Sequence, residues 1–240
     1  MQTIVISLKH STARRLRVER ELADTGLVCT FFEATDSTQE NFQYASRAHA
    51  ALTRKRKGYS LTAGELACYS SHLRVWERCV EAGEQFLVLE DNAELCNTLP
   101  AEKIRELIAD IPPLDYVKLS TALSGRSFKC YSSISGTHKL VRYTKYTSGA
   151  SAYLISPEGA RKLIAGAGQF LEPVDDYMEK PWRHQVIAYS VYPSVFQRAS
   201  IESTIGSDRK QKGRSTVRSK LYRELYRIYE SIMNRIYLLR

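Results

Sequence analysis

Short apolar runs alternate with amphipathic stretches along most of the chain. Residues 3–8 (TIVISL) and 86–89 (FLVL) are apolar and partly β-branched, which is typical of strands buried on both faces. Residues 12–25 instead repeat apolar side chains at helical spacing and stop before Gly26. Strands that alternate with helices in this way predict an α/β fold with a mostly parallel central sheet.

The same pattern predicts seven more elements. Helices are expected over residues 62–81, 101–110 and 157–164, and strands over residues 28–34, 116–119, 150–156 and 186–192, the last being the final strand of the body. Two polar stretches without a clear period, residues 36–60 and 120–147, are expected to be loops, the second on the acceptor side of a site. The basic run at residues 54–57 fits either solvated surface or a mobile loop over an anionic substrate.

The helix expected over residues 62–81 carries its own start signal. Thr62 is a suitable N-cap, and Glu65 stands three residues later as the partner of a capping box. The apolar stripe of this helix recurs at helical spacing in Leu66, Tyr69, Leu73 and Trp76.

Three oxygen-bearing side chains, Glu90, Asp91 and Asn92, directly follow the apolar strand at residues 86–89. In an open α/β sheet the carboxyl ends of the central strands meet the ligand crevice. Oxygen ligands there suit a hard divalent cation such as Mg²⁺ or Mn²⁺ beside a phosphorylated substrate. The alternative is a solvated acidic turn. No glycine-rich phosphate-binding pattern follows the first strand, which disfavours dinucleotide and P-loop chemistry.

Residues 61–77 (LTAGELACYSSHLRVWE) and the strand end LVLEDN together resemble the core signature of glycosyltransferase family 25, the lipopolysaccharide biosynthesis enzymes. Further matches follow in the same order at residues 5–8 with Arg14-Arg15, and at residues 32–36, 148–155 and 173–175, so that the resemblance spans roughly residues 3–206. Five ordered motifs are far more specific than any single one.

This resemblance implies a GT-A-type fold and an inverting transfer of a hexose, galactose from UDP-galactose, onto the oligosaccharide of a lipid-linked lipopolysaccharide acceptor. Asp175, with Asp176 beside it, matches the position of the catalytic base, and N-capping of a following helix is the structural alternative for Asp175. The residues that the resemblance assigns to the donor are Ser7, Leu8, Arg15, Ala34, Asp36, Glu65, Ser71, His72, Glu90 and Asp91.

One position departs from the family pattern. Asn92 stands where the family has a second Asp, and the resemblance assigns a metal, Mn²⁺ or Mg²⁺, to Asp91 and Asn92. Because an amide oxygen binds hard cations more weakly than a carboxylate, we expect the metal to be weakly held. The same departure keeps open a second hypothesis, a member that binds a sugar nucleotide without turnover.

The charge of the chain is unevenly distributed. The net charge is +9, from 35 basic and 26 acidic side chains, and +7 of it falls in residues 207–240. A non-enzymatic nucleic-acid-binding module is a third hypothesis, but it is disfavoured because the basic residues form a tail and no nucleic-acid motif is present. The five cysteines are odd in number and lack CxxC spacing, which favours a reducing cytoplasm. No signal peptide or membrane span is expected.

The tail predicts a separate unit. We divide the chain into a catalytic domain at residues 1–206 and a basic connector with a helix at residues 207–240. From Lys220 onward apolar side chains recur at helical spacing among tyrosines and basic residues, which is typical of a helix lying on an anionic membrane surface, here the cytoplasmic face of the inner membrane. The alternatives are packing on the protein's own core or on a second subunit. Removal of the chain after Gly206 is expected to leave a folded domain.

Overall fold

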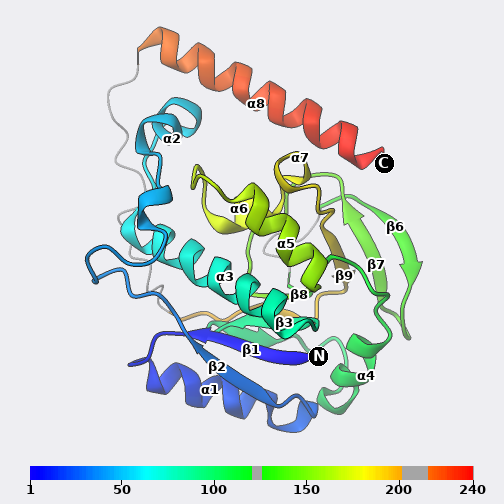
Figure 1. Cartoon of the computed structure of the whole chain (residues 1–240). Helices are drawn as coiled ribbons and strands as arrows, with labels where there is room; N and C mark the ends of the chain where they lie inside the picture. Colours follow the sequence, from blue (N-terminus) through cyan, green and yellow to red (C-terminus); the bar gives the residue numbers. More distant parts are fainter. Residues whose placement is uncertain (121–125, 202–215, 240) are drawn as a thin grey trace.

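A computed structural model describes residues 1–120, 126–201 and 216–239, and its centre is an eight-stranded sheet (Figure 1). The strand order is β2-β1-β3-β8-β5-β9-β7-β6, and a two-stranded sheet, β10-β4, lies apart from it. The strands are β1 (Gln2–Ser7), β2 (Cys29–Glu33), β3 (Phe86–Glu90), β4 (Ala93–Leu95), β5 (Tyr116–Lys118), β6 (Phe128–Ser133), β7 (Lys139–Tyr143), β8 (Ala152–Ile155), β9 (Tyr189–Tyr192) and β10 (Phe196–Arg198).

Most strands of the large sheet run in one direction. β1 is parallel to β2 and to β3, and β5 is parallel to β9. β8 runs antiparallel to β3 and β5, and β7 runs antiparallel to β9 and β6, so these two strands oppose the other six. The predicted α/β class with a mostly parallel sheet is therefore confirmed.

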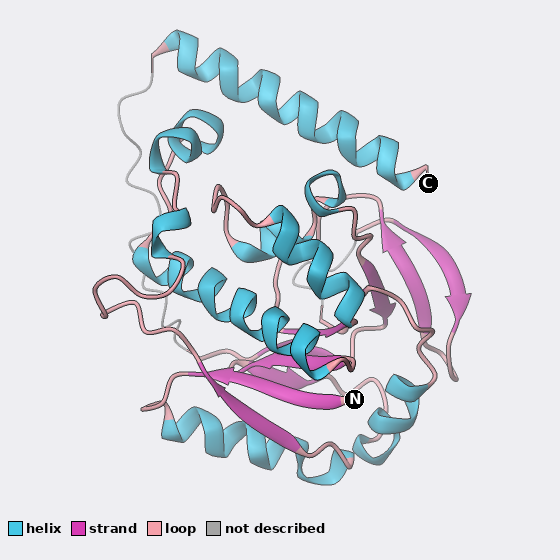
Figure 2. Ribbon diagram, in the orientation of Figure 1, coloured by secondary structure: helices cyan, strands magenta, loops and turns pink. Residues whose placement is uncertain are grey.

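Helices cover both faces of the sheet (Figure 2). They are α1 (Thr12–Leu22), α2 (Ala50–Lys57), α3 (Ala63–Ala82), α4 (Ile104–Ala109), α5 (Pro157–Gly166), α6 (Val174–Met178), α7 (Pro181–His184) and α8 (Val217–Leu238), with short 3₁₀ turns η1 (Ala23–Thr25), η2 (Ala45–Arg47) and η3 (Ala101–Lys103).

The two faces of the sheet build two cores because alternate strand residues point to opposite sides. Ile4 and Val88 face the core that contains Tyr69 and Trp76 of α3 together with α5 and α6. Val5 and its neighbours on the sheet face the second core, which α1 and α4 cover. Such two-sided burial explains why β1 and β3 are continuous apolar runs.

Three segments correct the expectations from sequence. Residues 120–147 are not one loop, because β6 and β7 form a hairpin at the sheet edge. β9 is not the last strand, since β10 follows it and pairs with β4. The basic run at residues 54–57 is neither loop nor fully solvated, because it ends α2, and Lys57 is largely buried against Glu230 of α8.

The predicted C-terminal helix is present as α8. Figure 1 shows it lying over α2 and α7, at the top of the view. No helix in the described part of the chain is long and apolar enough to cross a membrane. The domain boundary predicted after residue 206 and most of the predicted connector before the helix lie outside the described residues.

Candidate active site

The carboxyl ends of β1 and β3 meet at one edge of the sheet because the two strands are parallel neighbours, with Ile6 opposite Glu90. Ser7 Oγ donates to Asp91 Oδ2 at 2.9 Å, and Arg14 Nη1 from the start of α1 pairs with Asp91 Oδ1 at 2.9 Å. Asp91 is buried, and both of its carboxylate oxygens interact with protein side chains. This carboxylate therefore braces the strand ends.

Two other arginines of α1 support the same edge. Arg17 Nη2 donates to the carbonyl oxygens of Asp91 and Ala93, both at 2.8 Å. Arg15 Nη2 donates to the carbonyl oxygen of Ser7 at 3.2 Å, and its guanidinium lies over the Phe31 ring at 5.0 Å. The structure thus directs Arg15 to the protein, whereas Arg14 lies beside the crevice.

α3 begins with the capping box that the sequence predicts. Thr62 Oγ1 accepts from the Glu65 backbone N–H at 3.1 Å, and Glu65 Oε2 accepts from the Thr62 N–H at 2.9 Å. About two turns further along the helix, Ser71 Oγ donates to the Ala67 carbonyl and accepts from the Thr35 N–H, both at 2.8 Å. Ser71 therefore ties α3 to the loop after β2.

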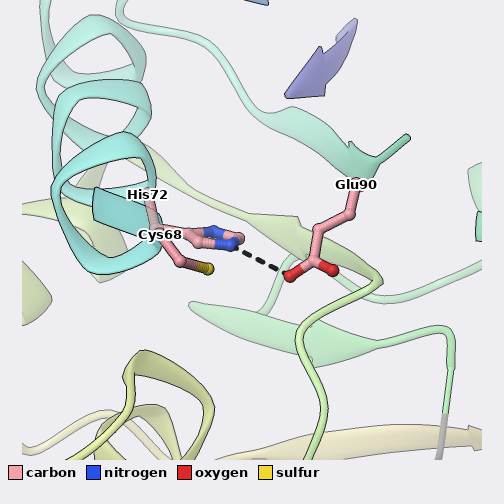
Figure 3. Close-up of side chains that lie close together, drawn as sticks. All are labelled: Cys68, His72 and Glu90. Carbon is pink, nitrogen blue, oxygen red and sulfur yellow. Dashed lines mark hydrogen bonds and ion pairs between the residues drawn. The ribbon is translucent and has the colours of Figure 1, made fainter. Parts of the chain in front are cut away.

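His72 is completely buried and belongs to a chain of hydrogen bonds across the core. Trp76 Nε1 donates to Tyr153 Oη at 3.0 Å, and that oxygen lies 2.8 Å from His72 Nδ1. His72 Nε2 faces Glu90 Oε1 at 3.3 Å (Figure 3). Burial alone would raise the pKa of Glu90, but the hydrogen bond and charge of His72, with help from Asn92 and Arg198, hold it below its usual value.

Asn92 has one satisfied and one unsatisfied amide atom. Its Nδ2 donates to Glu90 Oε2 at 2.9 Å, while its Oδ1 is buried without a hydrogen-bond partner. A buried acceptor without a donor is costly in a folded protein, so a cation or a donor group at Oδ1 would be stabilising. Glu90 and Asn92 thus fit a hard divalent ion, whereas Asp91 is held by Arg14.

A second donor set adjoins the first. The Cys68 sulfur, the His72 imidazole and the Glu90 carboxylate offer ligand atoms within 4.8 Å of one another (Figure 3). Thiolate and imidazole favour a softer ion such as Zn²⁺ over Mg²⁺. Because Glu90 belongs to both sets, any metal at this edge involves Glu90.

The first pocket is lined by the strand ends of β1 and β3, by the loop after β2 and by the first three turns of α3. It brings together most of the residues predicted to bind the donor. Its lining residues are Ile6, Ser7, Leu8, Arg14, Ala34, Thr35, Ser37, Gly64, Ala67, Cys68, Ser71, His72, Glu90, Asp91, Asn92 and Arg198.

The second pocket adjoins the first and shares four of its residues, Cys68, Glu90, Asn92 and Arg198. Its other walls come from the segment before β8 and from the start of α6. The lining residues it does not share are Glu65, Ser120, Ser148, Gly149, Ala150, Ser151, Pro173, Val174 and Asp175. The two pockets therefore meet at the Glu90–Asn92 strand end.

Asp175 reaches the second pocket from the first turn of α6. Its Oδ2 accepts from the Gly149 N–H at 2.9 Å and its Oδ1 accepts from the Asp176 N–H at 3.0 Å. Pro173, and not Asp175, is the N-cap of α6, which corrects the structural alternative considered for Asp175. Burial, and then the charge of Asp175, raises the pKa of Asp176 to about 6.

The remaining predicted residues lie apart from the first pocket. Asp36 is outside both pockets, and its Oδ1 accepts from the backbone N–H and hydroxyl of Thr38, at 2.9 and 2.7 Å. Glu65 lines the second pocket instead of the first. The sequence reading did not select Arg198, which stands on β10 opposite Ala93, because no motif marks that strand. Arg14 was visible in the Arg14-Arg15 pair, although only Arg15 was assigned to the donor.

Comparisons with known proteins agree with the location of the motifs. A family model described as "Glycosyltransferase family 25 (LPS biosynthesis protein)" matches residues 1–178. The chain is 29% identical over 217 residues to procollagen galactosyltransferase 1 of Danio rerio, covering 82% of this chain and 34% of that protein. It is 30% identical over 204 residues to procollagen galactosyltransferase 2 of Mus musculus, covering 80% and 32%.

A third relative, from Bos taurus, is described as "Probable inactive glycosyltransferase 25 family member 3", with 26% identity over 186 residues, 74% of this chain and 31% of that protein. This chain thus spans about a third of the length of these relatives. Among solved structures, a glycosyltransferase involved in glycosylation of the major capsid of PBCV-1 aligns over 95% of this chain and 98% of its own, with 11% identity and a TM-score of 0.42.

Proposed function

Because this chain belongs to glycosyltransferase family 25, we propose that it transfers a hexose, galactose from UDP-galactose, to a hydroxyl of a lipid-linked oligosaccharide with inversion at the anomeric carbon. Two adjoining pockets that share the Glu90–Asn92 strand end carry this proposal. A group transfer needs two substrates in contact at one point, and the shared wall supplies that point. The galactosyltransferase relatives support the choice of sugar.

In the proposed complex the first pocket holds the sugar nucleotide. Arg14 and the N-terminal turns of α1 and α3 line the region where phosphates would lie, and helix N-termini favour anions. Glu90 and Asn92 would hold a divalent cation whose chemistry is to neutralise the charge of the diphosphate. The first pocket supplies this donor site from β1, β3 and α3.

The acceptor hydroxyl would enter the second pocket beside Asp175. In the transfer its oxygen forms a bond to the anomeric carbon while its proton passes to the Asp175 carboxylate. The bond between the anomeric carbon and the diphosphate oxygen breaks, and its electron pair leaves with UDP. Arg198 lines both pockets, and in the proposed complex its guanidinium would stabilise the negative charge that develops on the leaving group.

UDP release from UDP-sugars, measured with and without an oligosaccharide glycolipid acceptor, tests this function. We expect UDP-galactose to give acceptor-dependent UDP release. Release that requires a different sugar nucleotide would correct the donor. Binding of UDP-galactose without turnover on any acceptor would instead support the weakened member that Asn92 suggested, a class to which the bovine relative's name also points.

A further inference from the structure

The outer face of α8 is an exposed apolar stripe. The described chain has few large apolar side chains that are more than a third exposed, and most of them are on this helix. Figure 1 shows α8 as the outermost element over α2 and α7. The stripe residues and their exposed fractions are Leu221 (61%), Leu225 (57%), Ile228 (55%), Ile232 (52%), Ile236 (43%) and Leu239 (82%).

The opposite face of α8 is fixed to the protein by polar contacts. Glu230 is buried and pairs with Lys180 of the α6–α7 turn and with Lys57 of α2. Further along, Asn234 Nδ2 donates to the Thr144 carbonyl at 3.1 Å, and Arg142 donates to the Tyr237 carbonyl. The orientation of the helix is thus set by its polar face, and this orientation leaves the apolar stripe outside.

Aromatic contacts with α2 reinforce this orientation. Lys55 Nζ lies 4.5 Å from the Tyr222 ring centre, and the Arg56 guanidinium lies 4.9 Å from that of Tyr226. Helix α8 and the basic end of α2 therefore form one continuous surface.

The charge around the stripe is positive. Arg218, Lys220, Arg227 and Arg235 are exposed on α8. The two acidic residues of the helix neutralise only part of this positive charge. Glu230 faces inward, and Glu224 is paired with Arg227 at 2.6 Å. Two copies that met through this face would bring like charges together, whereas anionic lipid headgroups complement them.

We propose that the outer face of α8 is an interfacial surface that binds an anionic lipid bilayer, with the apolar stripe entering the headgroup region and the basic side chains contacting lipid phosphates. The stripe runs from Leu221 to Leu239, so it extends over about 27 Å at 1.5 Å per residue. Apolar area and charge would both contribute to binding. Lipid binding is independent of the proposed reaction, so each can fail without the other.

Vesicle flotation of the full chain tests the lipid surface. The vesicles contain either phosphatidylcholine alone or phosphatidylcholine with phosphatidylglycerol, at low and high salt. We expect binding to the anionic vesicles only, weakened by salt because exposed charges are screened. The double variant I228S/I232S should bind at least tenfold more weakly. The double variant K220Q/R227Q should lose about fivefold per residue, the usual effect of a basic side chain near an anionic surface.

A matched control removes apolar side chains that are equally exposed but lie elsewhere. Leu16 and Val28 are 53% and 89% exposed, so L16S/V28S should bind anionic vesicles like the wild type. Thermal unfolding of each variant shows whether it is folded. Equal binding to neutral and anionic vesicles, or unchanged binding of folded I228S/I232S, would overturn the proposal. So would a dimer in light scattering that I228S/I232S dissociates while the wild type binds no vesicle.

Discussion

Asp175 has a structural role in the wall of the second pocket and a proposed catalytic role as the base. Its two oxygens accept backbone N–H groups of Gly149 and Asp176, so the carboxylate holds the wall of the second pocket as well as facing it. D175N keeps the size of the side chain, but its NH2 group cannot accept a hydrogen bond, so one of these two bonds is lost together with the proposed base. We expect kcat to fall by roughly 10²–10⁴-fold. KM for UDP-galactose should barely change. A raised KM with normal kcat would assign Asp175 a purely structural role.

Asn92 sets the expected metal dependence. The buried Oδ1 without a partner would be a weak, neutral ligand for the proposed cation beside Glu90. N92D adds a negative charge at this position, and we expect the Mn²⁺ concentration for half-maximal activity to fall by about tenfold. E94D is a matched carboxylate change outside both pockets and should leave it unchanged. Full wild-type activity in EDTA would contradict a role for the metal.

Asp176 predicts a pH dependence of stability. Burial and the neighbouring Asp175 raise the pKa of Asp176 to about 6, so the folded state disfavours its charged form. A carboxyl group whose pKa is higher in the folded than in the unfolded state stabilises the folded state at pH values below its unfolded pKa. This contribution is lost as the pH rises from about 4 to about 6. D176N cannot ionise, so urea unfolding should show it more stable than the wild type above pH 6, by up to about 3 kcal/mol. Below pH 4 the two should agree, and a gain that persists there would have another cause.

At this scale the sequence located the strand-end acids and the Ser71-His72 pair, because a motif fixes their spacing. The sequence could not reveal which of the two acids pairs with an arginine, since Asp91 meets Arg14 only when α1 folds back over β3. Arg198 was missed for a related reason. It reaches the site through a pairing of β10 with β4 across about a hundred residues, and no local pattern records such a pairing.

The start of α3 is the element on which the site depends most directly. Thr62 and Glu65 satisfy each other's backbone N–H groups, and Glu65 also lines the second pocket. T62A should lower the free energy of unfolding by about 1 kcal/mol, the usual cost of losing such a cap. S11A is the matched control, because Ser11 caps α1 without a side-chain hydrogen bond and should cost little. If T62A and S11A lower the free energy of unfolding equally in urea, the Thr62 cap does not contribute to stability.

Elements with a strong apolar period were predictable, whereas the polar hairpin of β6 and β7 at one edge of the sheet was not. β1, α1, α3, β3 and α5 follow their expected ranges because each buries one face or both. β6 is mostly exposed and β7 partly so, and their polar composition resembles a loop. The sequence of α2 is basic and lacks a long apolar stripe, so its packing against α8 could not be predicted from its own residues.

At the scale of the whole molecule, a buried cluster of ion pairs joins α8 to the rest of the protein and is expected to contribute to its stability. Lys180 pairs with Glu172 at 3.0 Å and with Glu230, and Arg183 also pairs with Glu172. Breaking one partner of a buried pair typically costs about 3–5 kcal/mol. We therefore expect E230Q to lower Tm by roughly 6–20 °C, at about 2–4 °C per kcal/mol for a chain of this size. Glu224 forms an exposed ion pair with Arg227 and provides the control, since E224Q should change Tm little.

The same cluster revises the expected effect of removing the tail. The sequence suggested that the chain up to Gly206 would fold unchanged, but loss of α8 would leave Lys57 without its carboxylate partner and open the cover over α2 and α7. We propose that the truncated protein is less stable than the full chain. This coupling was invisible in the sequence because Glu230 and Lys180 are fifty residues apart.

The pairing of β10 with β4 also has a consequence for the order in which the protein is made. Residues up to Asn92 supply nearly all of the first pocket, and they leave the ribosome early. Asp175 and then Arg198 emerge much later. A nascent chain would therefore hold most of the proposed donor pocket well before it holds the groups proposed for transfer, so that any donor binding would precede catalysis during synthesis.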